Sequence, residues 1–292
     1  MHSYLKSIGF SEISDKKEMD RILDEVTIRY DEIREVERGK KHNFVEMSKS
    51  FGCDFGITVC GEMDENNRFQ MEYYFPYFRG TGITSEEEIV IEKHAGKESY
   101  AGACDDIRIG VTMIFYVQNA SEYLEESSHG NYCRDVYPIT MAGLARSGTI
   151  LFPVLKSEEQ EKTNTEKTFN RNRMIAAARS GDEEAIENLT MEDIDTYSMI
   201  AGRLRTEDVY SIVDSYFIPY GMECDLYSVM GDITEFSKVR NRKTGEEVYE
   251  LRIACNDIEF DVCINAKDLL GEPEAGRRFK GVIWLQGHIH FR

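Results

Sequence analysis

The sequence predicts an α+β protein: an N-terminal antiparallel sheet domain with a covering helix, a helical segment, and a small C-terminal β-barrel-like (OB-like) unit. Apolar and polar residues alternate with a period of two over 232–291, as in half-buried strands. Strand candidates follow one another with short turns between 43 and 118, and apolar residues at helical spacing gather between 169 and 217. Consecutive strands without regular helix alternation favour an antiparallel sheet over a doubly wound fold.

The first predicted element is a helix that starts at Asp15 and runs towards Val36. Asp15 and Glu18 have the spacing of a capping box. One face of this helix is apolar, and the opposite face is rich in charged residues. We expect it to cover a sheet with its apolar residues Met19, Ile22, Leu23, Val26 and Tyr30.

A wholly polar run divides the chain. Residues 156–167 (KSEEQEKTNTEK) contain no apolar side chain, which predicts a linker. We therefore predict an N-terminal α+β domain over 1–155, a helical segment over 168–220 and a C-terminal β unit over 221–292. A chain of 292 residues suits several units, because single cores stop growing near roughly 250–300 residues.

The helical segment is predicted to contain four helices, the last of them starting at Thr206 and reaching Phe217. In the C-terminal unit, Asn256 and Asp257 form a tight hairpin signal between two strands. The order strand, strand, strand, short helix, strand resembles a small Greek-key or OB-like barrel.

Charge and cysteine content restrict the function classes. The 35 basic and 54 acidic residues give a formal charge of −19, which disfavours nucleic-acid and anionic-membrane partners. No apolar run approaches the roughly 20 residues that span a bilayer, and no signal peptide is recognisable. Seven cysteines without C-x-x-C spacing argue against a disulfide framework or zinc ribbon. We expect a cytoplasmic protein without a membrane partner.

The last strand carries the candidate site. Ile283, Leu285 and Ile289 point to one side of it, and the opposite side presents Trp284, Gln286, His288 and His290. We predict that this opposite side binds a ligand or a protein partner. His288 and His290 have a workable spacing for a metal pair, but the sequence places no third ligand beside them, so no metal and no cofactor is predicted.

Other patterns have structural explanations. Arg240, Arg242, Lys243, Arg277, Arg278 and Lys280 could form a basic rim for single-stranded nucleic acid. From Gly221 onward, however, 13 acidic residues outnumber ten basic ones, which makes nucleic acid an unlikely partner. The aromatic run 73–78 either lines a pocket or packs in a core or at a sheet edge, and strand packing is the favoured interpretation.

No catalytic residue is predicted, because the chain contains neither G-x-S-x-G nor H-E-x-x-H. The leading hypothesis is a non-catalytic intracellular binding or scaffold protein for an unknown protein or small molecule. One alternative is an enzyme with an unfamiliar site, which a deep pocket at His94, Asp105 or His129 would favour. A second alternative is single-stranded nucleic-acid binding by the C-terminal unit.

Several segments resemble an uncharacterised bacterial family. These are MHSYLKSIGFS, LTMEDIDTYSMI, YGMECDLYSVMGDI, CNDIEFDVCIN and DLLGEPEAGRRFKGVIWLQG. They are similar to the domain-of-unknown-function family 3881, and the resemblance covers essentially the whole chain. It implies a bacterial, cytoplasmic protein and assigns no activity, cofactor or site residue.

Overall fold

The chain is described here by a computed structural model. The described residues are 2–13, 15–38, 42–128, 136–154, 170–171, 173–178, 180–191, 202 and 208–291. The predicted linker 156–167 and the candidate His129 lie outside them.

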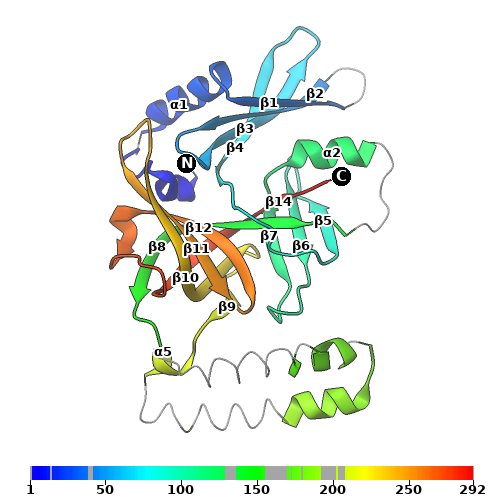
Figure 1. Ribbon diagram of the computed structural model, residues 1–292. Helices are drawn as coiled ribbons and strands as arrows, with labels where there is room; N and C mark the ends of the chain where they lie inside the picture. The colour runs from blue at the N-terminus through cyan, green and yellow to red at the C-terminus, as the bar shows by residue number, and fades with distance from the viewer. Residues whose placement is uncertain are drawn as a thin grey trace.

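An antiparallel four-stranded sheet forms the upper part of the molecule in Figure 1. Its strands follow chain order: β1 (Glu32–Arg38), β2 (His42–Ser50), β3 (Phe55–Asp64) and β4 (Phe69–Phe78). Helix α1 (Lys16–Ile28) packs on this sheet, with its N-terminus capped by the Asp15 side chain. The apolar face predicted for the helix is buried at Met19, Ile22, Leu23 and Val26.

Helix α1 is shorter than the sequence pattern predicts. It ends at Ile28, and the residues expected to continue it form β1 instead. β1 pairs with β2 along its whole length, from Glu32 opposite Ser48 to Arg38 opposite His42. This ladder of backbone hydrogen bonds to the next strand outweighs the local helical spacing, as structural context often does.

The second sheet includes a closed five-stranded barrel. Strands pair in the cyclic order β8–β12–β11–β10–β14, and β14 returns to pair with β8. Only the β8–β12 pair within this ring is parallel. The bounds are β8 (Ile139–Leu151), β10 (Leu226–Arg240), β11 (Glu247–Cys255), β12 (Ile258–Asn265) and β14 (Arg278–Ile289). The α+β class and the barrel-like unit are therefore confirmed, whereas the OB-like comparison stays a prediction.

The remaining elements extend or border this sheet. One further arm runs from β14 to the edge through β7 (Met113–Val117), β6 (Tyr100–Cys104) and β5 (Ile89–Lys93). Strands β9 (Tyr216–Pro219) and β13 (Leu269–Leu270) pair with β10 and β8. The short helices are η1 (Ser3–Ile8), α2 (Ala120–Ser128), α5 (Val209–Ile212) and η2 (Ala266–Asp268).

One turn and one helix end in the C-terminal part bear on the predictions. Asn256 and Asp257, both with positive φ, join β11 to β12, so the predicted tight hairpin is confirmed. The helix expected from Thr206 to Phe217 is wrong at its end, because α5 stops at Ile212 and β9 follows. Alternate burial in β9, with Phe217 buried and Ile218 exposed, is typical of a strand with one face packed on the core.

Strand pairing crosses the predicted domain boundary. β8 lies before residues 156–167 and pairs with β12 and β14, which lie after them. The division into 1–155, 168–220 and 221–292 stays a prediction. Residues 173–178 and 183–191 are helical within the segment predicted to be so.

Candidate functional site

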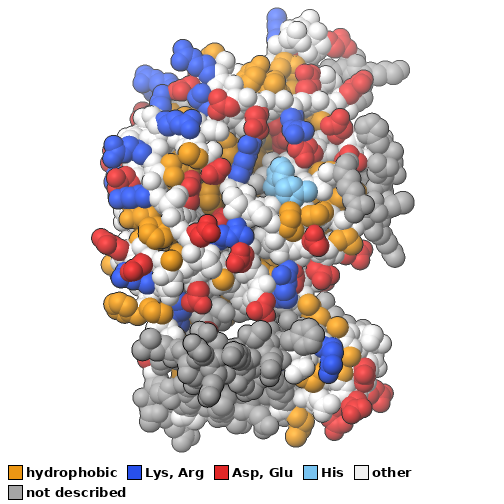
Figure 2. Space-filling view, in the orientation of Figure 1, with side chains coloured by type: hydrophobic (Ala, Val, Ile, Leu, Met, Phe, Trp, Pro, Cys, Tyr) orange, Lys and Arg blue, Asp and Glu red, His pale blue; other side chains and the backbone are white. Residues whose placement is uncertain are grey.

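A cavity of about 360 Å³ lies where the four-stranded sheet meets the end of β14 and the start of α2. One wall is formed by strands β1 to β4 and by the residues directly after β4. The other wall is formed by α2, β8 and β14. In Figure 2 a histidine patch lies between charged side chains of both signs near the centre of this face. The lining residues are Glu32, Arg34, Glu46, Ser48, Thr58, Tyr77, Arg79, Gly80, Gln118, Asn119, Glu122, Thr140, His288 and His290.

The lining contains almost only polar side chains. Three Glu face two Arg and two His, with hydroxyl and amide groups between them. Ligand cavities are more often mainly apolar, with a few polar groups that fix orientation. A cavity with this lining is suited to a small molecule that forms many hydrogen bonds.

The first half of the predicted face of β14 is closed to ligands. Trp284 is only 6% exposed and packs against the rings of His2, Tyr4 and Tyr116. Its Nε1 donates to Asp225 Oδ2 at 2.7 Å. A ring packed in this way is not available to stack on an external base or ligand.

Gln286 is fully buried, and both ends of its amide have protein partners. Its Oε1 accepts from the Phe78 N–H at 3.2 Å and from Gln118 Nε2 at 2.9 Å. Its Nε2 donates to the Pro76 carbonyl at 2.8 Å. Gln286 therefore joins β14 to the end of β4, since Pro76 and Phe78 carry the backbone groups that it satisfies.

The next residue explains why β14 lies so close to the neighbouring arm. A Cβ atom at Gly287 would lie 2.3 Å from Cδ2 of Phe115 in β7. Only a glycine at this position permits such a close approach of the two strands. β14 and β7 pair in parallel at this point. The same approach carries the chain to His288 at the cavity.

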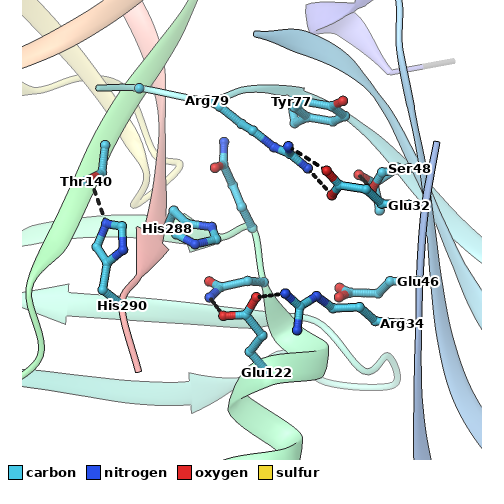
Figure 3. A pocket seen from close by; sticks show the side chains of 14 residues that line it. Glu32, Arg34, Glu46, Ser48, Tyr77, Arg79, Glu122, Thr140, His288 and His290 are labelled. Atoms are coloured by element: carbon cyan, nitrogen blue, oxygen red, sulfur yellow. Dashed lines mark hydrogen bonds and ion pairs between the residues drawn. The ribbon is translucent and has the colours of Figure 1, made fainter. Parts of the chain in front are cut away.

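The second half of the face lines the cavity. In Figure 3, His288 points into the space between the Arg79–Glu32 and Arg34–Glu122 pairs. Within the described part of the chain, the His288 side chain makes no hydrogen bond or ion pair, although its ring lies 5.1 Å from that of His290. Burial lowers the pKa of His288 below its ordinary 6.5. A neutral imidazole offers one donor and one acceptor, so His288 presents both to the cavity.

His290 lies at the edge of the cavity, and one of its ring nitrogens already has a hydrogen-bonding partner. Its Nε2 is 2.8 Å from Thr140 Oγ1, a contact drawn in Figure 3, and its backbone N–H donates to the Pro138 carbonyl. No group of three or more metal-ligating side chains occurs among the described residues. The histidine pair therefore lacks a third ligand in that part of the chain.

Two ion pairs border the cavity. Arg79 binds Glu32 through both terminal nitrogens, with Nη1 at 3.0 Å from Oε1. Arg34 lies 2.7 Å from Glu122 Oε1, and Glu122 Oε2 also accepts from Asn119 Nδ2. The hydrogen bonds from Arg79 lower the pKa of Glu32.

Glu46 is the one buried carboxyl group in the cavity wall. Its Oε2 accepts from the Ser121 N–H at 3.1 Å and from the Ser121 hydroxyl, so this β2 residue holds the first turn of α2. Burial raises its pKa to about 7, and the two hydrogen bonds from Ser121 oppose that rise. Since Oε2 already accepts twice, we expect a proton on this carboxyl at Oε1, which has a weak contact with Cys60 Sγ at 3.9 Å.

Other residues singled out in the sequence lie elsewhere. His94 Nδ1 contacts Ser99 Oγ at 3.0 Å, Asp105 accepts from Thr112, and neither His94 nor Asp105 lines this cavity. The aromatic run of β4 is largely buried, as favoured, although Tyr77 also reaches the cavity wall.

Five of the six basic side chains considered as a rim have partners within the protein, among them Lys280, which bonds to the Tyr210 hydroxyl. Arg278 is buried and donates to three backbone carbonyls, and Lys243 pairs with Glu25. Arg277 and Arg240 pair with Glu274 and Glu247. No described helix is both long enough and apolar enough to cross a membrane.

Sequence reasoning identified His288 and His290 but missed the opposite wall. Glu32 and Arg34 were placed on a helix, where side chains two apart do not share a face. In a strand they do, and the pairing of β1 with β2 brings Glu46 and Ser48 beside them. The sequence EIREVER carries no alternation that would have indicated a strand, because its two apolar residues, Ile33 and Val36, are three positions apart.

The chain was compared with known proteins and families. No curated protein and no solved structure matches it. The model of one family, described as "Domain of unknown function, E. rectale Gene description (DUF3881)", matches residues 5–287. The match covers nearly the whole chain, and the chain therefore belongs to this domain-of-unknown-function family.

Proposed function

We propose that the protein is a non-catalytic cytoplasmic binding protein that takes a small polar molecule in the cavity between β1–β4 and β14. The observation that carries this proposal is His288. Its ring faces a 360 Å³ cavity and has no hydrogen-bonding partner in the described part of the chain. A polar ring with unused hydrogen bonds in a concave site is the kind of group that fixes the orientation of a ligand.

Size and charge support a small ligand. Cavities that hold ligands range from roughly 300 to 1,000 Å³, so about 360 Å³ suits a molecule at the lower end of that range. Two Arg face Glu32 and Glu122, while Glu46 is partly protonated near pH 7. The wall thus carries little net charge and many donors and acceptors. A cytoplasmic location is supported by the described cysteines, all of which are free thiols.

The test is a thermal-shift screen with amino acids, short carboxylic acids, sugars and nucleosides at millimolar concentration. A ligand present at 100 times its Kd stabilises the folded state by roughly 2.7 kcal/mol. We expect at least one class to stabilise the wild type and to lose this effect in His288→Leu. The matched control is His42→Leu, since His42 is exposed on β2 and does not line the cavity.

Two results would contradict the proposal. The first is that no class stabilises the wild type. The second is that hits stabilise His288→Leu as much as they stabilise the wild type and His42→Leu.

An enzyme is the second candidate, and Glu46 favours it. A carboxyl group with a pKa of about 7 in a cavity can donate or accept a proton at neutral pH. A hit from the screen would be incubated with the wild type and with Glu46→Gln and followed by NMR. Conversion by the wild type alone would indicate catalysis, whereas an unchanged ligand in both samples supports the binding protein.

A further inference from the structure

Arg79 is fixed in the cavity wall by three separate contacts. Its backbone N–H donates to the Asp54 carbonyl at 2.7 Å, directly after the end of β4. Its guanidinium lies over the Tyr77 ring, 5.2 Å from the centroid. Both of its terminal nitrogens point at the Glu32 carboxylate. The backbone contact fixes where the side chain starts, and the Tyr77 ring supports the guanidinium independently of Glu32.

Glu32 has fewer contacts than Arg79. It is the first residue of β1, which is an edge strand, and 55% of its side chain is exposed. Among the described residues, its side chain bonds to Arg79 and to no other side chain or backbone group. Exposed ion pairs contribute roughly 0–1 kcal/mol, so another carboxylate can replace Glu32 with little loss.

The second ion pair of the cavity differs in this respect. Glu122 is 20% exposed, and its two oxygens are shared between Arg34 and Asn119. Asn119 in turn bonds to the backbone of Ile289 through both ends of its amide. Release of Glu122 would disturb the junction of α2 with β14, so the exchangeable carboxylate is Glu32.

The geometry also suits a carboxylate in particular. The terminal nitrogens of Arg79 meet a planar carboxylate in a two-point contact, the arrangement that guanidinium groups prefer. His288 lies across the cavity from this contact in Figure 3, where it can bond to a second polar group of the same molecule. A short carboxylic acid with a further hydrogen-bonding group would reach both.

We propose that the ligand of the cavity carries a carboxylate that binds Arg79 in place of Glu32. The Glu32 side chain occupies the site in the absence of ligand and turns to solvent when the ligand binds. This inference rests on the proposed function and specifies the ligand class. No covalent step is involved.

The test uses succinate, its neutral diamide and inorganic phosphate as probes in NMR titrations of the full-length chain. Three proteins are compared: wild type, Glu32→Gln and Arg79→Gln. In Glu32→Gln the competing carboxylate is gone, and we expect succinate to bind about fivefold more tightly than to the wild type. In Arg79→Gln we expect succinate binding to be lost, while the diamide, which carries no carboxylate, should show no binding that depends on Glu32 or Arg79. Glu35→Gln is the matched control, because Glu35 is exposed on the same strand and does not line the cavity.

The outcomes separate this inference from the proposed function. Equal succinate affinity in wild type and Glu32→Gln, or retained succinate binding in Arg79→Gln, would overturn the carboxylate proposal. Binding of phosphate without succinate would also overturn it. If neutral polar molecules bind in a His288-dependent manner while succinate does not, the binding function stands and the carboxylate class is wrong. If none of the probes or screened classes binds, both proposals fail.

Discussion

One face of β14 carries two pairs of polar side chains that differ in how their hydrogen bonds are used. Trp284 and Gln286 are buried, and their polar atoms bind Asp225 and the end of β4. His288 and His290 border a cavity, and His288 has no hydrogen-bonding partner in the described part of the chain. The difference shows that a shared strand face does not imply a shared role. The neighbours of each residue decide whether its polar groups stabilise the fold or remain available to a ligand.

The largest effect is expected for Trp284→Ala. The buried ring packs on Tyr4 and Tyr116, so its removal should cost about 3–5 kcal/mol in the free energy of unfolding. Urea unfolding followed by circular dichroism measures this loss, with Trp284→Phe as the milder variant. A loss below about 1 kcal/mol would mean that this half of the face is not part of the core.

A slightly smaller effect is expected for Gln286→Leu. The substitution leaves the Phe78 N–H and the Pro76 carbonyl buried without partners, at about 1–3 kcal/mol each. We expect a total loss of about 2–4 kcal/mol in urea unfolding. Gln70→Leu is the control, since Gln70 is exposed on β4 and should change stability by less than about 0.5 kcal/mol. Equal stability of the two variants would contradict the structural role assigned to Gln286.

In the cavity wall opposite β14, Glu46 makes the stability of the protein depend on pH. Its folded pKa of about 7 lies above the ordinary 4.5, so the folded state binds more protons between these values. The free energy of unfolding therefore falls by an amount on the order of 3 kcal/mol as the pH rises from 4.5 through 7. Above pH 7 it is level. In Glu46→Gln this fall should be absent, and the variant should exceed the wild type at pH 8. Urea unfolding at pH 5, 6, 7 and 8 measures the difference, and parallel profiles would contradict it.

The smallest effect on stability is expected for His288→Leu, at the part of the β14 face that lines the cavity. His288→Leu removes no hydrogen bond to the described chain, so the free energy of unfolding at pH 7 should change by less than about 1 kcal/mol. Ligand stabilisation in the thermal-shift screen should nevertheless disappear. If the free energy of unfolding fell as much as in Gln286→Leu, His288 would have a structural role like that of Gln286.

The sequence predicted much of this arrangement, within physical limits. Period-two alternation placed His288 and His290 on one side of a strand, and the Asn256–Asp257 turn was predicted from its residue types. Both signals are local. Local spacing could not reveal that β1 pairs with β2, which places Glu32, Arg34 and Glu46 in the cavity wall. Nor could it show that β8, from the first half of the chain, closes the barrel beside β14.

The identity of the open residue was the least predictable part. Trp284, Gln286, His288 and His290 were equivalent in the sequence, since each lies two positions from the next. Gln286 became structural because β4 ends beside it with two unsatisfied backbone groups. His288 remained available because the neighbouring Arg and Glu side chains pair with one another. Such competition for partners is decided only in the folded molecule.

The central claim is that His288 is the open polar group of a ligand site. Its most direct test is NMR of the imidazole nitrogens in protein labelled with ¹⁵N-histidine, recorded during titration with a hit from the screen. We predict that the ring nitrogens of His288 shift in a saturable manner, while those of His94, which contacts Ser99 away from the cavity, do not. Saturable binding that leaves the His288 nitrogens unchanged would contradict the claim.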